Sequence, residues 1–276
     1  QRVKIVSVGE ITIDHYLDQE VSFVGGISLN FAVHAKRCGT DTVSLVSCVG
    51  TDEAGIRIFR PLTDEGVDAS HVTILNGKTA TCDIHVQNYA ERSYPSGGYH
   101  LNVLADFQLS EADLAFIGQH DILVSMVDHS QSAVFFNRVS TDTAFAGKRV
   151  VDFGDWSDYR DGYNRLLSCA DKLDIAFVSG SQATIDRLRP LSIDVRGLIV
   201  VTLGAGGSVV LHQGRLLSQG AIPVSHPVDS TGCGDAFQAA FTVHYFRTGD
   251  INEALYKGAV QAALVLQHYG AFSQIV

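Results

Sequence analysis

A stretch late in the chain places two glycines and a carboxylate at the start of an apolar helix. It reads DSTGCGDAF over residues 229–237. Glycines let the backbone turn its N–H groups inward, and a helix N-terminus adds partial positive charge, so Gly232, Cys233 and Gly234 are expected to form an anion hole for a phosphoryl group in transfer. Asp235 falls in the first helical turn, where it is placed to accept a proton from a substrate hydroxyl. The alternative is that Asp235 only caps the helix.

A second glycine-rich loop reads TLGAGGS over residues 202–208. Gly204 and Gly206 have the spacing of a dinucleotide loop, but the third glycine is absent and a strand-like run follows, so the Rossmann context fails. No Gly-x-x-x-x-Gly-Lys-Ser/Thr sequence exists, which excludes a P-loop. A tight turn and a nucleotide loop remain as interpretations, and the neighbouring anion hole favours the nucleotide loop.

A carboxylate and an amide follow the first predicted strand. Asp14 comes after that strand, and Gly25, Gly26 and Asn30 open the first predicted helix. Ligands of doubly wound sheets bind beyond the carboxyl ends of the strands, where these side chains are suited to grip sugar hydroxyls. Asp14 as a simple turn former is the alternative.

Composition excludes several classes of protein. Of the 276 residues 46% are hydrophobic and only 18% are charged, which rules out intrinsic disorder. The formal charge of −10 argues against nucleic acid and against anionic membrane as partners. No apolar run reaches the roughly 20 residues of a membrane helix, and no secretory signal is expected. Five cysteines without a Cys-x-x-Cys pair indicate a reducing, cytoplasmic setting, and the histidines lack the spacing of a transition-metal site. Cys233 is interpreted as a small filler between two glycines.

Strand and helix patterns alternate along most of the chain, which predicts parallel βαβ units in a three-layer αβα sandwich. Strands are expected at 3–9, 43–49, 122–127, 149–153, 173–179, 197–203, 208–212 and 215–218. Helices are expected at 27–38 with Gly39 as the C′ residue, at 53–65 with a break at Pro61, and at 110–118, 131–140, 161–169, 181–188, 235–247 and 251–268. Residues 72–100 interrupt this rhythm and predict an antiparallel excursion.

The excursion predicts a small β lid, built from about 12–24 and 79–98, on a single domain that spans residues 1–276. Gly97 and Gly98 are suited to act as its hinge. Arg92 follows a polar turn in this lid, and it either reaches the substrate or is a solvated turn arginine.

Taken in order, these motifs resemble the ribokinase-like (PfkB-type) carbohydrate kinases. Gly9 and Asp14, the Gly-Gly-x-x-x-Asn series, the 202–207 loop and the 229–237 stretch carry the resemblance, which covers nearly the whole chain. Shorter stretches at 105–110, 121–122, 151–153 and 267–271 are similar to fructoselysine kinases.

The resemblance implies transfer of the ATP γ-phosphoryl group to a primary hydroxyl, with Mg²⁺. It implies that Asp235 is the base, that Gly232, Cys233 and Gly234 form the anion hole, and that Asp14, Gly25, Gly26 and Asn30 bind the sugar. Thr202, Gly204 and Gly207 match the nucleotide loop. The backbone around Asp229, Thr231 and Gly270 resembles a site for a monovalent cation such as K⁺, and the lid is often a homodimer interface in such kinases.

One position departs from the family pattern. Many members carry Asn-x-x-Glu after a central strand, where it helps to hold Mg²⁺ and its waters, and the matching residues here are Ser179 and Gln182. A neutral Gln182 accepts from a magnesium-bound water without adding charge, so a weak magnesium affinity is expected. The predicted activity is phosphorylation of a sugar or fructosamine. The alternatives are a kinase for a ketose, a keto-sugar acid or a nucleoside, and a catalytically silent binding protein.

Overall fold

The computed structural model describes residues 3–87, 90–127, 144–155 and 163–273, and these contain two sheets. The large sheet has nine strands in the order β14-β13-β12-β11-β10-β9-β1-β4-β5. Along the chain these strands are β1 (Lys4–Val8), β4 (Thr42–Gly50), β5 (Asp68–Leu75), β9 (Ile122–Met126), β10 (Lys148–Asp155), β11 (Ile175–Ser179), β12 (Leu198–Thr202), β13 (Ser208–His212) and β14 (Arg215–Gln219). All neighbours from β5 to β12 pair in parallel, whereas the pairs β12–β13 and β13–β14 are antiparallel.

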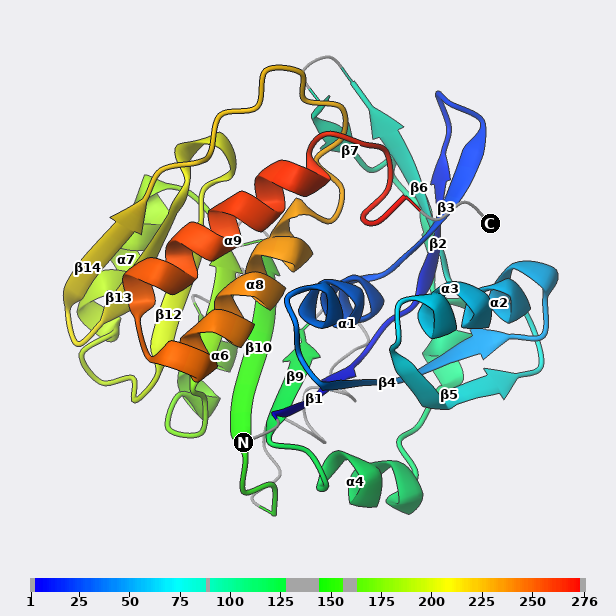
Figure 1. Ribbon diagram of the computed structural model, residues 1–276, viewed down its shortest axis with the longest axis horizontal. Helices are drawn as coiled ribbons and strands as arrows, with labels where there is room; N and C mark the ends of the chain where they lie inside the picture. The colour runs from blue at the N-terminus through cyan, green and yellow to red at the C-terminus, as the bar shows by residue number, and fades with distance from the viewer. Residues whose placement is uncertain (1–2, 88–89, 128–143, 156–162, 274–276) are drawn as a thin grey trace.

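The helices cover both faces of this sheet, and Figure 1 shows α1, α8 and α9 side by side on one face. The α-helices are α1 (Ile27–Arg37), α2 (Glu53–Arg57), α3 (Phe59–Asp64), α4 (Glu111–Ile117), α6 (Asn164–Cys169), α7 (Gln182–Leu191), α8 (Cys233–Thr248) and α9 (Ile251–Val265), with 3₁₀ turns η2 (Asn102–Asp106) and η5 (Gly204–Gly206). The helix expected at 131–140 lies outside the described residues.

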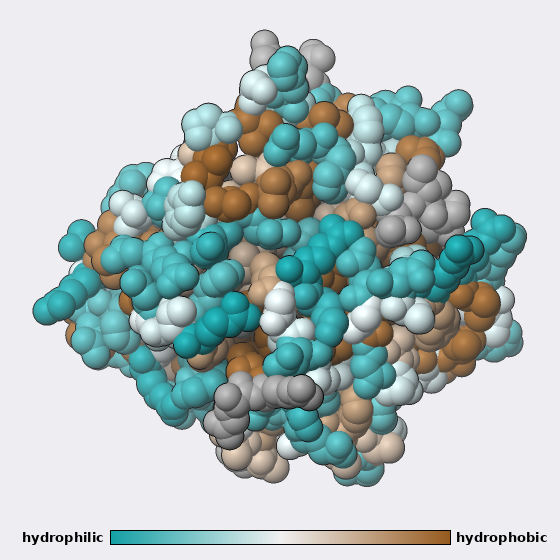
Figure 2. All heavy atoms as spheres, viewed as in Figure 1, coloured by the Kyte–Doolittle hydropathy of each residue, from teal (hydrophilic) through white to brown (hydrophobic). Residues whose placement is uncertain are grey.

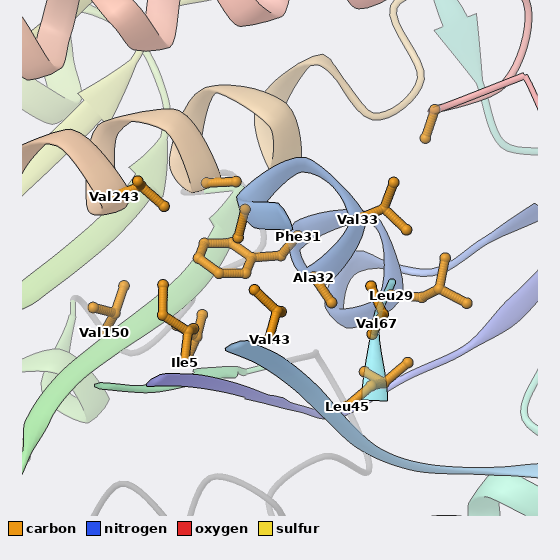
Figure 3. Packing of buried hydrophobic residues seen from close by; sticks show 14 of the residues in the cluster. Ile5, Leu29, Phe31, Ala32, Val33, Val43, Leu45, Val67, Val150 and Val243 are labelled. Atoms are coloured by element: carbon orange, nitrogen blue, oxygen red, sulfur yellow. The ribbon is translucent and has the colours of Figure 1, made fainter. Parts of the chain in front are cut away.

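Alternate residues of the central strands pack into different helix layers, because successive strand side chains point to opposite faces. On β10, Val150 packs with the layer that holds α1 and α8, whereas Val151 packs with α6 and α7. Figure 3 shows Val150 and Val243 on one side of Phe31, in the space between α1, α8 and the sheet. Strands buried on both faces explain the continuous apolar runs in the sequence.

The second sheet has five short strands and lies beside α1 in Figure 1. They are β2 (Thr12–Tyr16), β3 (Val21–Gly25), β6 (Thr81–Val86), β7 (Arg92–Ser93) and β8 (Tyr99–His100). The expected strand content of 12–24 and 79–98 is therefore present. The expected pairing is partly wrong, because β2 and β6 run parallel to each other while β3, β7 and β8 pair antiparallel.

Two further expectations need correction or refinement. Residues 68–75 form β5, a parallel edge strand of the large sheet, so the interruption of the βαβ rhythm begins later than expected. Its burial alternates irregularly, which hid the strand in the sequence. The 53–65 helix is divided into α2 and α3, and Pro61 lies in the first turn of α3, where its missing N–H has no helical partner to lose.

The outer face of the molecule over α1, α8 and α9 is mostly hydrophilic, with hydrophobic side chains gathered toward its upper part (Figure 2). Among the described residues, no helix has both the length and the apolar character needed to cross a membrane.

Candidate active site

Side chains from α1 and α8 meet where the small sheet adjoins the large one. Asn30, in the first turn of α1, donates from Nδ2 to Oδ2 of Asp235 over 2.8 Å. Asp235 is the third residue of α8, and the N-cap position is taken by Gly232 in a left-handed conformation with φ +78°. The Asp235 side chain is thus directed to Asn30 and does not occupy the cap position. The two predicted residues, distant in sequence, belong to one site.

The Asp235 carboxyl group is poised near neutrality. Its pKa is raised to about 6, mainly by burial and in the same direction by the nearby Asp152 carboxylate. The amide of Asn30 and the Arg92 guanidinium act in the opposite direction. A carboxyl group with a pKa close to neutral pH is suited to accept a proton from a hydroxyl group, because the best general bases titrate near the working pH.

Asp14 lies on β2 and faces the same region. Its Oδ1 accepts a hydrogen bond from Thr12 Oγ1 over 2.7 Å, and burial raises its pKa to about 7. Gly25 packs directly on it, since a Cβ atom at Gly25 would stand 2.1 Å from Asp14 Oδ2. Any residue larger than glycine at position 25 would therefore clash with the Asp14 carboxylate. Gly26 forms the turn into α1 with φ +102°.

Arg92 begins β7 of the small sheet and reaches toward the α8 loop. Its Nη1 donates to the carbonyl oxygen of Ser230 over 3.3 Å, and its guanidinium lies 5.6 Å from the centre of the Tyr94 ring. Its positive charge lowers the pKa of both Asp14 and Asp235. The structure thus brings the exposed Arg92 to the edge of the candidate site.

Asp229 is buried, and its carboxylate is hydrogen-bonded to three segments of the chain. Its Oδ2 accepts from Tyr16 Oη at 2.5 Å and from the Gly270 N–H at 3.0 Å, and its Oδ1 accepts from the Thr231 N–H at 2.9 Å. The predicted cation-site backbone of Asp229, Thr231 and Gly270 is brought together here. The Asp229 carboxylate itself is engaged by three hydrogen-bond donors. Nothing in the sequence indicated the role of Tyr16. Its hydrogen bond reaches Asp229, which is 213 residues further along the chain.

Asp152 is a second residue that the motif analysis did not assign to the site. It is buried near the end of β10, where its Oδ1 accepts from the Gly154 N–H over 2.8 Å and its carboxyl group is hydrogen-bonded by Gln238. Burial raises the pKa of Asp152 as well. The only signal in the sequence was a carboxylate near the end of a predicted central strand, the position at which α/β sheets bind ligands.

The 202–207 loop joins β12 to β13 at the same end of the sheet. Thr202 Oγ1 lies 3.0 Å from Ser179 Oγ on the neighbouring strand, and Gly204 is exposed in η5. Gly207 adopts φ +90°, and a Cβ atom there would stand 2.2 Å from the carbonyl oxygen of Gln219. Gly207 is thus needed for the close approach of β14, while the exposed turn at Gly204 leaves its backbone open to a ligand.

Gln182 opens α7 on the surface, and its Nε2 donates to Asp186 Oδ1 over 2.9 Å. Within the part of the chain that the structure describes, no group of three or more His, Cys, Asp or Glu side chains could hold a metal ion by itself. Mg²⁺ commonly binds through one or two carboxylates together with substrate phosphates and waters. The oxygen-only chemistry of Asp152 and Asp235 fits such a cation when it arrives with phosphate groups.

Cys233 lies in the predicted anion hole, and burial raises the pKa of its thiol to about 12. Its Sγ lies 3.5 Å from the carbonyl oxygen of Ala262, to which the thiol donates. A protonated thiol is a poor nucleophile, which agrees with its interpretation as a filler.

Similar proteins share this architecture over the full chain. An adenosine kinase from Sinorhizobium meliloti superposes with a TM-score of 0.82 at 20% identity, covering 98% of this chain and 96% of that one. An Escherichia coli chain solved with ATP and Mg²⁺ superposes with a TM-score of 0.80 at 18% identity, covering 99% and 96%. These likenesses confirm the predicted αβα fold.

Two relatives are more similar in sequence. The fructoselysine 6-kinase of Escherichia coli (strain K12) is 30% identical over 97% of this chain and 99% of its own length. A fructosamine kinase of Bacillus subtilis (strain 168) is 29% identical over 98% of this chain and 93% of its own. The family model for pfkB family carbohydrate kinases matches residues 3–275. The chain therefore belongs to the pfkB family of carbohydrate kinases, as its motifs predicted.

Proposed function

We propose that the protein transfers the γ-phosphoryl group of ATP to a primary hydroxyl group of a fructosamine, a sugar joined to an amine. The observation that carries this proposal is the Asp235 carboxylate at the start of α8, held by Asn30 beside the Gly232–Gly234 amides. The full-length similarity to fructoselysine and fructosamine kinases supports the substrate class.

The proposed reaction needs positioning and charge stabilisation more than covalent chemistry. Asp235 accepts the proton of the attacking hydroxyl as the new oxygen–phosphorus bond forms. The N–H groups of Gly232 and Gly234 stabilise the negative charge on the transferred group, whereas the Cys233 N–H, also expected in the anion hole, donates to the Ser230 carbonyl oxygen over 3.2 Å. Asp14 and Asn30 orient the sugar. Among the described residues Asn30 Oδ1 is buried without a hydrogen-bond partner, which suits it to receive a ligand hydroxyl.

The charge of the site favours an amine-bearing substrate over a sugar acid. The carboxyl groups of Asp14, Asp152 and Asp235 lie close enough together that Arg92 lowers the pKa of all three. Three carboxyl groups around one arginine attract an ammonium group and repel a carboxylate. A bound ammonium would also stabilise the ionised form of Asp14, whose pKa of about 7 leaves it partly protonated at neutral pH.

ATP is assigned to the exposed loop that contains Thr202, Gly204 and Gly207. Mg²⁺, when bound, would neutralise negative charge on the ATP phosphates. Asp152 and Gln182 are the residues that would hold magnesium-bound waters. A monovalent cation such as K⁺, if used, would take backbone oxygens around Thr231 and Gly270, because the Asp229 carboxylate already accepts three hydrogen bonds.

The whole chain is assigned as a single domain in which the small sheet acts as a lid and a homodimer surface. The exposed residues Leu17 and Tyr94, which directly follow β2 and β7 of this sheet, support a surface that closes or pairs. Hydrogen exchange across residues 79–98 is expected to slow when substrate binds, and light scattering is expected to give a dimer mass. Unchanged exchange would contradict the lid, and a monomer mass would contradict the homodimer.

A turnover panel tests the function. ADP release is measured with ATP and Mg²⁺ over fructoselysine, fructose, 2-keto-3-deoxygluconate and cytidine, which are cationic, neutral, anionic and nucleoside acceptors. We expect fructoselysine to have the highest kcat/KM and the anionic sugar acid the lowest. Preference for cytidine would replace the proposal with a nucleoside kinase, and no turnover on any acceptor would favour a silent binding protein.

A further inference from the structure

A cavity of about 280 Å³ lies outside the candidate active site. Its lining includes the first residues of β10 and β12 and the last turn of α8, with Lys148, Arg196, His212, Tyr245 and Phe246 as its chemically distinctive side chains. Ten residues of α8 separate Tyr245 from Asp235, a rise of roughly 15 Å. The cavity is therefore at the amino ends of the strands whose carboxyl ends approach the nucleotide and sugar sites.

Two cations in this cavity share a single carboxylate. Asp174 Oδ2 accepts from the Arg149 N–H over 2.9 Å, and its Oδ1 lies 3.2 Å from Lys148 Nζ. Arg196 Nη2 is 3.7 Å from the same Oδ1, which is too long for a hydrogen bond. Lys148 and Arg196 thus exceed Asp174 by one positive charge in a protein whose formal charge is −10.

The guanidinium of Arg196 retains its hydrogen-bonding capacity. Its side chain is 64% exposed, and it makes no hydrogen bond to any residue in the described ranges. A guanidinium presents its N–H groups as a planar fork that matches the oxygens of a phosphate or carboxylate. Lys148, half-exposed at the start of β10, adds a second positive charge to that of Arg196 in the loop before β12.

Aromatic side chains also line the cavity. The Tyr245 and Phe246 rings have their centroids 5.4 Å apart with an angle of 57° between their planes. His212 is oriented by its own backbone contact, because Nδ1 lies 3.2 Å from the carbonyl oxygen of Gly197 and must donate to it. Aromatic rings and cations in the lining of one cavity match a ligand that has both a flat or cyclic body and an anionic group.

We propose that this cavity binds a small phosphomonoester that carries a ring. Its phosphate group lies between Arg196 and Lys148, and its ring packs on Tyr245 and Phe246. A phosphomonoester fits better than a carboxylate because its terminal phosphate group offers three acceptor oxygens, enough for the guanidinium fork of Arg196 and the ammonium group of Lys148 together. The same chemistry is offered by a nucleoside monophosphate and by a sugar phosphate.

Calorimetric titration of the full-length protein tests the proposal. AMP and glucose 6-phosphate are titrated separately into protein saturated with ADP and Mg²⁺, so that the nucleotide site is already filled. At least one probe is expected to bind at one site per chain with a Kd below about 1 mM. Binding of AMP alone identifies a nucleotide site, binding of glucose 6-phosphate alone identifies a sugar-phosphate site, and binding of both identifies recognition of the phosphate; each supports the proposal.

The matched variants are Arg196→Glu, which reverses the charge in the cavity, and Arg187→Glu, which makes the same change at an exposed position of α7. Arg196→Glu is expected to weaken the probe at least tenfold, while Arg187→Glu leaves the Kd within about twofold of wild type. Failure of both probes to bind, or equal binding by wild type and Arg196→Glu, would overturn the proposal.

Discussion

Asn30 Nδ2 donates a hydrogen bond to Asp235 Oδ2 over 2.8 Å, although 205 residues separate the two in sequence. This bond joins the first turn of α1 to the first turn of α8. It fixes the carboxylate next to the residue that is proposed to bind the sugar, and it lowers the pKa of that carboxylate. The proposed base and the proposed sugar-binding group are therefore one unit.

Replacing Asp235 by Asn should remove most turnover without unfolding the protein. The side chains are nearly isosteric, but the amide cannot accept the proton, and general base catalysis is worth about 10²–10⁴ in rate. The loss should appear in kcat, with ATP affinity and Tm close to wild type. Steady-state kinetics and a thermal melt measure both.

Asp250→Asn is the matched control for this variant. Asp250 is a true N-cap, accepting from the Asn252 and Glu253 N–H groups of α9, and Asn caps about as well as Asp. The control should keep normal turnover and Tm. If Asp235→Asn behaves like this control and keeps more than about a tenth of kcat, the base lies elsewhere.

The pH profile of kcat/KM should have an acidic limb with its midpoint near pH 6, the pKa of Asp235. Activity rises with pH through this midpoint because the base must be unprotonated. Asp152→Asn removes a neighbouring negative charge and should shift the midpoint to lower pH. Asn30→Ala removes a hydrogen bond to the carboxylate and should shift it to higher pH. Shifts in the same direction would contradict this assignment.

Tyr16→Phe should destabilise the protein by about 2 kcal/mol, because it removes a hydrogen bond to a buried carboxylate. Asp229 keeps its two backbone donors, so the fold should persist, and the loop before α8 should lose one of its hydrogen bonds to the small sheet while keeping the bond from Arg92 to Ser230. Chemical denaturation measures the change in unfolding free energy. Tyr256→Phe makes the same atomic change at an exposed position of α9 and should have no effect on stability; equal stability of the two variants would show that the Tyr16 bond contributes nothing.

Gln182→Glu should lower the Mg²⁺ concentration that gives the half-maximal rate, because a carboxylate attracts the hydrated cation more strongly than an amide. The change also places a carboxylate beside Asp186, so the double variant with Asp186→Asn separates repulsion from metal binding. Rates measured over a magnesium titration, for both variants and wild type, distinguish the two effects. An unchanged or higher requirement in both variants would exclude Gln182 from the metal site.

His34 should make stability depend on pH. It is buried between α1, α9 and the 270–271 loop, with Nε2 donating to the Ala271 carbonyl oxygen and Nδ1 accepting from Gln261, and burial lowers its pKa from 6.5 to about 4. The unfolded chain therefore takes up this proton first as the pH falls. The His34 contribution is complete above pH 6.5 and is lost toward pH 4 at up to about 1.4 kcal/mol per pH unit.

The measurement is the difference in unfolding free energy between wild type and His34→Gln across this pH range. The difference isolates His34, because Asp14 and Asp235 have raised pKa values and act with the opposite sign in both proteins. Parallel pH curves for the two proteins would show that His34 does not titrate as described.

Local sequence determined the elements and the motif backbones of this protein. The predicted end of the first helix is found, with Gly39 at φ +83° after Cys38, and Gly232 turns the chain into α8. These features depend on only a few neighbouring residues. Glycine readily adopts the backbone conformations that end or begin a helix, and the spacing of apolar residues sets which face of an element is buried. The parallel direction of the central strands likewise follows from the alternating strand and helix patterns.

Tertiary structure alone decided which distant groups meet. The parallel pairing of β2 with β6, the edge strand β5, the bond from Tyr16 to Asp229 and the place of Asp152 beside Asp235 all join segments far apart in sequence. Such contacts depend on how whole elements pack, and no local periodicity encodes them. The raised pKa of Asp235 has the same origin, since burial and neighbouring charge exist only after the chain has folded.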